Sequence, residues 1–153
     1  MKACGNAAAA IVRILADTTG WRGARYHGAG GQHMAARRML RHRWSDIAVE
    51  SITPAIDRKF ITTERVTLAN FQLKAGGVVP RHAHEQEQLS YVVSGALKFV
   101  MEGQTVVASA GDVVQIPSGL AHEVEVLEDS SVIDVFAPVR QDWIDKTDTY
   151  FRR

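Results

Sequence analysis

Short apolar runs, each ended by turn residues, follow one another from residue 60 onward at a spacing of roughly ten residues. The stretch 60–73 predicts one or two strands, and further strands are expected at 89–93, 96–101, 105–108, 113–116, 123–127 and 131–136. None of these runs has helical periodicity. The pattern therefore predicts an all-β domain, either a sandwich or a small barrel. Only the tail 140–153 is expected to form a helix, with Trp143 packed under the barrel.

Candidate metal ligands lie inside this pattern. His82 and His84 are one residue apart and Gln88 follows them, while His122 comes much later in the chain. Because side chains alternate between the two faces of a strand, the first three are expected on one face, pointing into one cavity. Three imidazoles and one amide oxygen leave coordination positions for water or substrate, as catalytic metal sites do. A His-x-His pair alone also occurs on surface strands that bind no metal, so its surroundings must decide.

The spacing of the surrounding residues resembles the two sequence motifs of the cupin family. In the first motif a Gly is followed by five residues, His-x-His, three residues, the fourth ligand, six residues and a second Gly. In the second motif a Gly is followed by five residues, Pro-x-Gly, two residues and a His. The residues at these positions are Gly76, His82, His84, Gln88 and Gly95 in the first motif, and Gly111, Pro117, Gly119 and His122 in the second.

This resemblance implies a fold and a cofactor. The fold would be a single-domain cupin β-barrel, also called a jelly roll or double-stranded β-helix. The cofactor would be a divalent transition metal, with nickel, zinc, manganese and iron as candidates. The implied metal ligands are His82, His84, Gln88 and His122.

Two residues depart from the usual cupin pattern. Gln88 stands where most metal cupins have a carboxylate, and Val126 stands where an Asn is usual. A neutral amide compensates less of the metal's charge, which favours Lewis-acid chemistry on a bound oxyanion over support of an oxidised iron. The alternative is a decayed site that binds metal weakly. The change at Val126 is expected to alter only strand packing.

The last predicted strand adds a second group of candidates. Asp134 and Phe136 have the same parity and face the cavity together, and Arg140 follows them. An Asp in an apolar strand is costly unless it is paired or has a function, and an ion pair with Arg140 or Arg81 is the structural alternative.

A Gln ligand combined with Asp-x-Phe, three residues, Arg and a following Asp-Trp resembles the small cupins of pectin and alginate breakdown. Those cupins open the ring of 4,5-unsaturated uronate monosaccharides to the linear keto-aldehyde. The resemblance implies that Asp134, Phe136 and Arg140 are the catalytic, cavity-lining residues. The expected activity is therefore a non-redox isomerisation of a small sugar acid.

Two other classes use the same fold. One is a metal-dependent dioxygenase of a small organic substrate, and the other is a cupin that binds a small ligand without converting it. Fold alone does not choose between them. In all three cases the expected partner is a small molecule, not nucleic acid or a membrane, and a homodimer is expected.

Composition bounds the remaining possibilities. The 153 residues, 46% hydrophobic and 23% charged, fit one domain with a sizeable core. The single cysteine, Cys4, excludes an internal disulfide and agrees with a reducing, cytoplasmic location. No apolar stretch reaches the ~20 residues needed to cross a bilayer.

Charge is divided unevenly along the chain. Of the 18 Lys and Arg and the 17 Asp and Glu residues, positions 1–43 hold eight basic residues and one acidic residue, Asp17. This shift predicts a boundary between a basic arm, 1–43, and a barrel domain, 44–153. The arm could be a nucleic-acid tail or a transit segment, but its composition favours a disordered arm, or sequence upstream of a start at Met34 or Met39. Its histidines, His27, His33 and His42, are therefore excluded as ligands.

Overall fold

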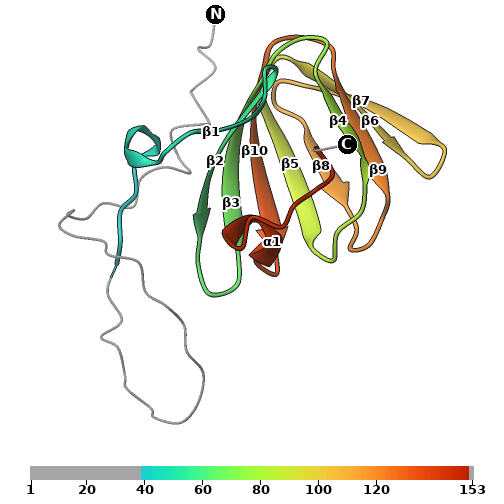
Figure 1. Ribbon diagram of the computed structural model, residues 1–153. Coiled ribbons are helices and arrows are strands. Elements are labelled where there is room, and N and C mark those ends of the chain that lie inside the picture. The colour runs from blue at the N-terminus through green and yellow to red at the C-terminus, as the bar shows by residue number, and fades with distance from the viewer. Residues whose placement is uncertain (1–38, 152–153) are drawn as a thin grey trace, which may run out of the picture. The chain divides into compact units, whose positions relative to one another are not determined.

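The computed structural model describes residues 39–151 (Figure 1). The chain divides into two units, Met1–Asp46 and Ile47–Arg153. In the first unit the described residues form a 3-10 helix at Trp44–Asp46. The arm predicted for 1–43 lies almost wholly outside the described residues, as does Cys4.

The second unit is built from two antiparallel sheets. Its strands are β1 (Glu50–Thr53), β2 (Ile56–Thr62), β3 (Thr67–Leu73), β4 (Val78–His82), β5 (Glu87–Ser94), β6 (Ala96–Met101), β7 (Gln104–Ser109), β8 (Val113–Ile116), β9 (His122–Val126) and β10 (Ser130–Ala137). One sheet has the order β1-β2-β3-β10-β5-β8 and the other has the order β4-β9-β6-β7 (Figure 1). The only helix described after β10 is the short α1 (Gln141–Ile144), so the tail is less helical than expected. The prediction of an all-β barrel is confirmed.

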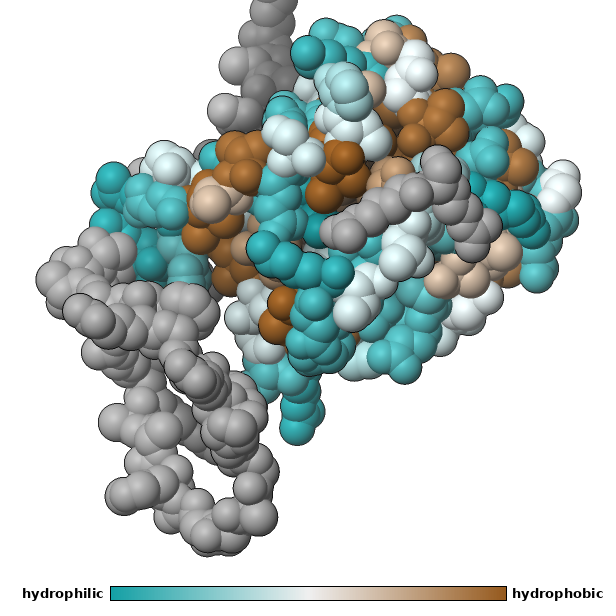
Figure 2. All heavy atoms as spheres, viewed as in Figure 1, coloured by the Kyte–Doolittle hydropathy of each residue, from teal (hydrophilic) through white to brown (hydrophobic). Residues whose placement is uncertain are grey.

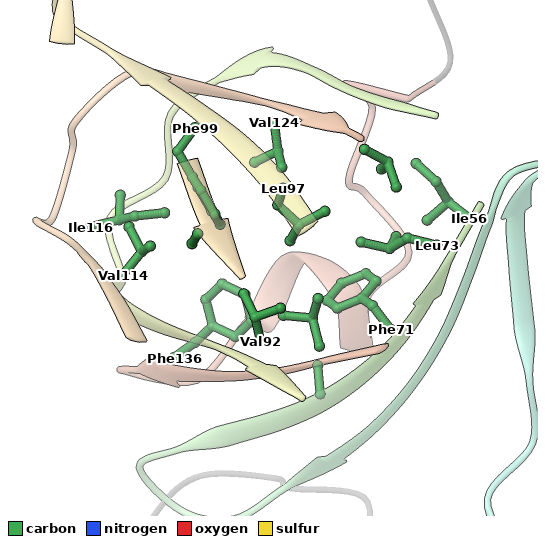
Figure 3. Packing of buried hydrophobic residues seen from close by; sticks show 14 of the residues in the cluster. Ile56, Phe71, Leu73, Val92, Leu97, Phe99, Val114, Ile116, Val124 and Phe136 are labelled. Carbon is green, nitrogen blue, oxygen red and sulfur yellow. The ribbon is translucent and has the colours of Figure 1, made fainter. Parts of the chain in front are cut away.

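Alternation of buried and exposed residues places the core between the sheets. In β10 every second residue is buried, and the register pairs this row with buried residues of β3 and β5. Figure 3 shows Phe136 and Val92 of one sheet directed toward Phe99 and Leu97 of the other. Trp143 of α1 is 1% exposed and meets the rings of Phe60, Phe71 and Phe136 edge to face, which confirms its expected place under the barrel.

On the face in Figure 2, hydrophobic residues are interspersed among hydrophilic ones, as on most folded domains. Within residues 39–151 no helix has the length and apolarity that a membrane span needs.

The turn between β5 and β6 depends on Gly95. Its φ is +81°, and a Cβ at this position would overlap the side-chain oxygen of Ser130 and the carbonyl of Asp129. Gly103 offers a matched comparison, because its φ is +79° but a Cβ there would meet nothing within 4 Å.

We expect Gly95→Ala to lower the free energy of unfolding by about 3 kcal/mol, since backbone strain adds to overpacking, and Gly103→Ala to lower it by about 1 kcal/mol. Urea denaturation of both variants measures the difference. Equal losses would mean that the contact with Ser130 and Asp129 relaxes without cost.

Candidate metal centre

Three histidines meet at one end of the space between the sheets. His82 ends β4 and is the register partner of His122, which begins β9. The ring nitrogens that these two and His84 offer lie within 4.8 Å of one another. Strand parity was the wrong reason for placing His84 here, because β4 stops at His82. His84 lies in the loop before β5, and that loop turns its ring back toward the other two.

Backbone carbonyls fix the orientation of all three rings. The Nδ1 atom of His82 lies 2.8 Å from the carbonyl oxygen of Pro80, that of His122 lies 2.8 Å from the oxygen of Leu120, and that of His84 lies 3.0 Å from the oxygen of Gln86. A carbonyl only accepts, so each neutral ring carries its proton on Nδ1. The lone pair is then on Nε2, the arrangement that metal-binding histidines usually have.

Burial also keeps the rings neutral. It is the main cause that lowers the pKa of His82 to about 3 and the pKa of His84 to about 4, with further contributions from neighbouring histidines and from the charge of Arg140. The pKa of His122 is lowered for the same principal reason. A metal competes only with protons on the ligating nitrogens, and here the Nε2 atoms carry none at neutral pH.

Gln88 presents its oxygen to this cluster. Its Nε2 donates to the Ser90 hydroxyl at 2.9 Å and to Asp134 Oδ2 at 3.1 Å, which fixes the orientation of the amide. Its Oε1 then lies 3.1 Å from Nε2 of His84. With the proton of His84 on Nδ1, two lone pairs face one another at that distance, which is unfavourable unless a cation lies beside both. The donor set of three imidazoles and one amide oxygen fits a divalent transition metal.

Asp134 is a buried residue of β10, the strand that pairs with the strand of Gln88. It is opposite Ser90 in the β10–β5 register, and its carboxylate accepts hydrogen bonds from Ser90 and Gln88. Burial raises the pKa of Asp134 to about 7, although both hydrogen bonds and the charge of Arg140 act in the opposite direction. The structure describes no ion pair of Asp134 with Arg140 or Arg81, so the alternative drawn from the sequence is not seen.

Arg140 is buried beside the cluster and already has partners. Its Nε and Nη2 donate to the two carboxylate oxygens of Asp142 at 2.9 and 2.7 Å, and Nη2 also donates to the Tyr150 hydroxyl at 3.3 Å. The guanidinium carbon lies 5.0 Å from the ring centroid of Phe136 and 4.2 Å from that of Trp143. Within residues 39–151 no hydrogen bond is described for Nη1, which leaves that nitrogen for a ligand.

These residues surround a cavity of about 50 Å³. Six of the seven residues proposed from the sequence line it: His82, Gln88, His122, Asp134, Phe136 and Arg140. The seventh, His84, joins them through the histidine cluster. Ser90, Tyr150 and Phe151 also line the cavity and were not among the residues proposed from the sequence. Ser90 has the parity of Gln88 and could have been found from it, whereas nothing in the tail marked Tyr150.

Changing His82 to Ala is expected to strip the metal, since it removes one of three fixed nitrogen ligands, whereas Gln88→Glu is expected to retain metal because a carboxylate is a stronger ligand than an amide. Elemental analysis of the purified variants decides this. A His82→Ala protein with the parent's metal content would show that the ligand assignment is wrong.

Two antiparallel sheets that form a barrel, with histidines gathered between them, are typical of one class of metal-binding β-barrel proteins. The family model described as Cupin domain matches residues 69–136. This chain belongs to the cupin family.

The chain is also similar to three individual proteins. The chain is 33% identical to KdgF from Halomonas sp. at a TM-score of 0.62, covering 66% of this chain and 96% of that one. It is 25% identical to an RmlC-like cupin from Shewanella frigidimarina at a TM-score of 0.63, covering 67% and 93%. It is also 30% identical over 81 residues to an uncharacterized protein of Streptomyces coelicolor, covering 52% of this chain and 77% of the relative.

Proposed function

We propose that this cupin holds a divalent metal through His82, His84, His122 and Gln88 and opens the ring of 4,5-unsaturated uronate monosaccharides. The observation that carries the proposal is Asp134, a buried carboxyl with a pKa of about 7 that is hydrogen-bonded to Gln88 in the histidine-lined cavity. The Gln at the fourth ligand position, the Asp-x-Phe, three residues, Arg motif and the 33% identity to KdgF support it.

Ring opening of such a sugar is an isomerisation. The anomeric hydroxyl loses its proton and becomes an aldehyde, the bond from that carbon to the ring oxygen breaks, and its electrons pass into the enol ether. Carbon 4 then gains a proton, so that a ketone forms at carbon 5 and no oxidant is needed. A bound divalent metal would supply Lewis acidity that favours negative charge on oxygen.

Asp134 is suited to move the proton. A general acid or base works best when its pKa lies near the working pH, and burial brings the pKa of this carboxyl to about 7. Its ionised form can accept the proton of the anomeric hydroxyl, and its protonated form can return one to carbon 4. The hydrogen bonds from Ser90 and Gln88 keep both carboxylate oxygens in place during this exchange.

Arg140 and Phe136 would define the substrate's position. The uronate carboxylate needs a cation, and Nη1 of Arg140 is the donor left by its pairing with Asp142. The carboxylate would therefore be held through that nitrogen, together with the Nη2–H that otherwise meets the Tyr150 hydroxyl. Phe136 is 2% exposed and gives the cavity an apolar wall, which strengthens charge interactions inside it.

The proposal is tested by incubating metal-loaded protein with unsaturated galacturonate and unsaturated mannuronate. The expected result is a loss of the conjugated enol-ether absorbance faster than in a protein-free control, which is needed because these sugars also open unaided. The His82→Ala protein should match the control. A fully loaded parent that never exceeds the control overturns the ring-opening proposal, and dioxygen consumption by iron-loaded protein would then favour the dioxygenase reading.

A further inference from the structure

The segment that follows α1, residues 145–151, is here called the C-terminal tail. Figure 1 shows the chain after α1 turning back across the open end of the barrel and running between the two sheets. Its last described residues, Tyr150 and Phe151, line the cavity together with His82 and His122. The tail is therefore part of the wall of the candidate metal centre.

Tyr150 contacts two groups of that site at once. Its ring is stacked on the imidazole of His82, with centroids 4.2 Å apart and an angle of 6° between the planes. Its hydroxyl accepts a hydrogen bond from Nη2 of Arg140. The Tyr150 ring therefore lies against His82, and its hydroxyl oxygen lies against the buried guanidinium of Arg140. A bound sugar acid would need both of these places, one for its ring and one for its carboxylate.

The cavity is small for the ligand that we propose. About 50 Å³ is room for a few waters only. Small-molecule pockets usually measure about 300–1,000 Å³, and an unsaturated uronate has about a dozen non-hydrogen atoms. A monosaccharide therefore does not fit into this cavity unless part of the wall moves.

The tail is the part of the wall with the fewest restraints. The strands are held by continuous ladders of backbone hydrogen bonds, whereas the tail runs as loop and turn after α1. Its anchor is a buried ion pair in which Nη1 of Arg58 donates to Asp148 at 3.1 Å, with side chains 3% and 8% exposed. Glu50 takes the other side of the Arg58 guanidinium, so the anchor ties the tail to β1 and β2.

We propose that the C-terminal tail is a lid on the metal cavity, anchored by the Arg58–Asp148 ion pair and closed by Tyr150 in the place that the substrate takes. Opening requires Tyr150 to leave His82 and Arg140, and the substrate then gains both contacts. This proposal rests on the proposed function only for the identity of the ligand, an unsaturated uronate. Such a lid covers the metal site while it is empty, and it must open before the substrate binds.

The test uses cobalt-loaded protein, whose visible absorption reports ligands at the metal. Azide binding and cobalt release to an excess of chelator are followed by stopped flow for the parent, Tyr150→Ala, Asp148→Asn and Tyr91→Ala. The last variant is the matched control, because Tyr91 lies in β5 next to the buried Ser90 and does not line the cavity. Melting temperatures verify that each variant is folded.

A lid is expected to slow binding and release alike. Tyr150→Ala and Asp148→Asn should therefore raise the azide association and dissociation rates together by about tenfold, with little change in azide affinity, and should speed cobalt release to the chelator. Tyr91→Ala should keep the parent's rates. If Tyr150 instead only positions His82, its loss weakens cobalt affinity without faster azide association, and the lid is overturned.

The outcomes also separate the lid from the proposed function. Parent rates in both tail variants overturn the lid and leave ring opening standing. Cobalt uptake without any ring opening overturns the proposed reaction. The azide and cobalt-release rates still test the lid in that case. A parent that takes up no cobalt overturns the metal site and the lid on it together.

Discussion

Asp134→Asn is expected to lower the turnover of uronate ring opening by about a hundredfold or more, because an amide cannot exchange the proton that general acid–base catalysis moves. Metal content should stay that of the parent. The Asn oxygen can accept from Nε2 of Gln88 while its amide nitrogen donates to the Ser90 hydroxyl, so the orientation of Gln88 is kept.

Steady-state kinetics beside elemental analysis checks this expectation. The control is Asp57→Asn, the same change in β2 at a position that does not line the cavity. A metal-loaded Asp134→Asn protein with the parent's turnover would remove Asp134 from the mechanism. A variant that loses turnover and metal together would assign Asp134 a structural part in the metal site.

Metal affinity is expected to be nearly independent of pH between 7 and 5. A peptide with three ordinary histidines of pKa 6.5 would lose about ten-thousandfold in affinity over this range, because each ring binds a proton that the metal must displace. In this protein burial lowers the pKa of His82 to about 3 and that of His84 to about 4, and it also lowers the pKa of His122. His82 and His84 therefore stay neutral at pH 5, and the lowered pKa of His122 acts in the same direction, so the loss should be far smaller than in that peptide.

The remaining loss has a separate cause. Asp134, with a pKa of about 7, gains a proton as the pH falls from 7 to 5, and the site loses a negative charge that would favour a cation. Competition titrations with a metal indicator at several pH values measure the affinity, and Asp134→Asn should remove the residual slope. An affinity that falls a thousandfold or more by pH 5 would show that the rings are not kept neutral by the fold.

Sequence patterns were sufficient to predict the barrel and the gathering of most candidate side chains around one cavity, because the relevant information is local. Alternating apolar positions marked the strands, and the spacing from Gly76 to Gly95 and from Gly111 to His122 marked the turns that carry the histidines. The same-face prediction for Asp134 and Phe136 is confirmed, since both are buried in β10. The roles assigned to these residues, a homodimer and a cytoplasmic location stay predictions.

What the sequence could not provide depends on contacts between distant segments. The hydrogen bond from Ser90 to Asp134 requires the β5–β10 register, which no local pattern encodes. Tyr150 meets His82 only because the tail folds back after a helix of four residues, where a longer helix was expected. The ion pair that places it joins Arg58 to a residue 90 positions later in the chain.

The amide of Gln88 has an evolutionary consequence. Its nitrogen donates to Asp134, so a Glu at position 88 would set two carboxylates about 3 Å apart and drive the pKa of one of them upward. A Glu at position 88 therefore disturbs proton transfer by Asp134. The conflict disappears only when residue 134 is replaced by an uncharged residue as well. A lineage moving between this site and the carboxylate-bearing kind would have to alter both positions, and the effects of the two single changes should be strongly non-additive.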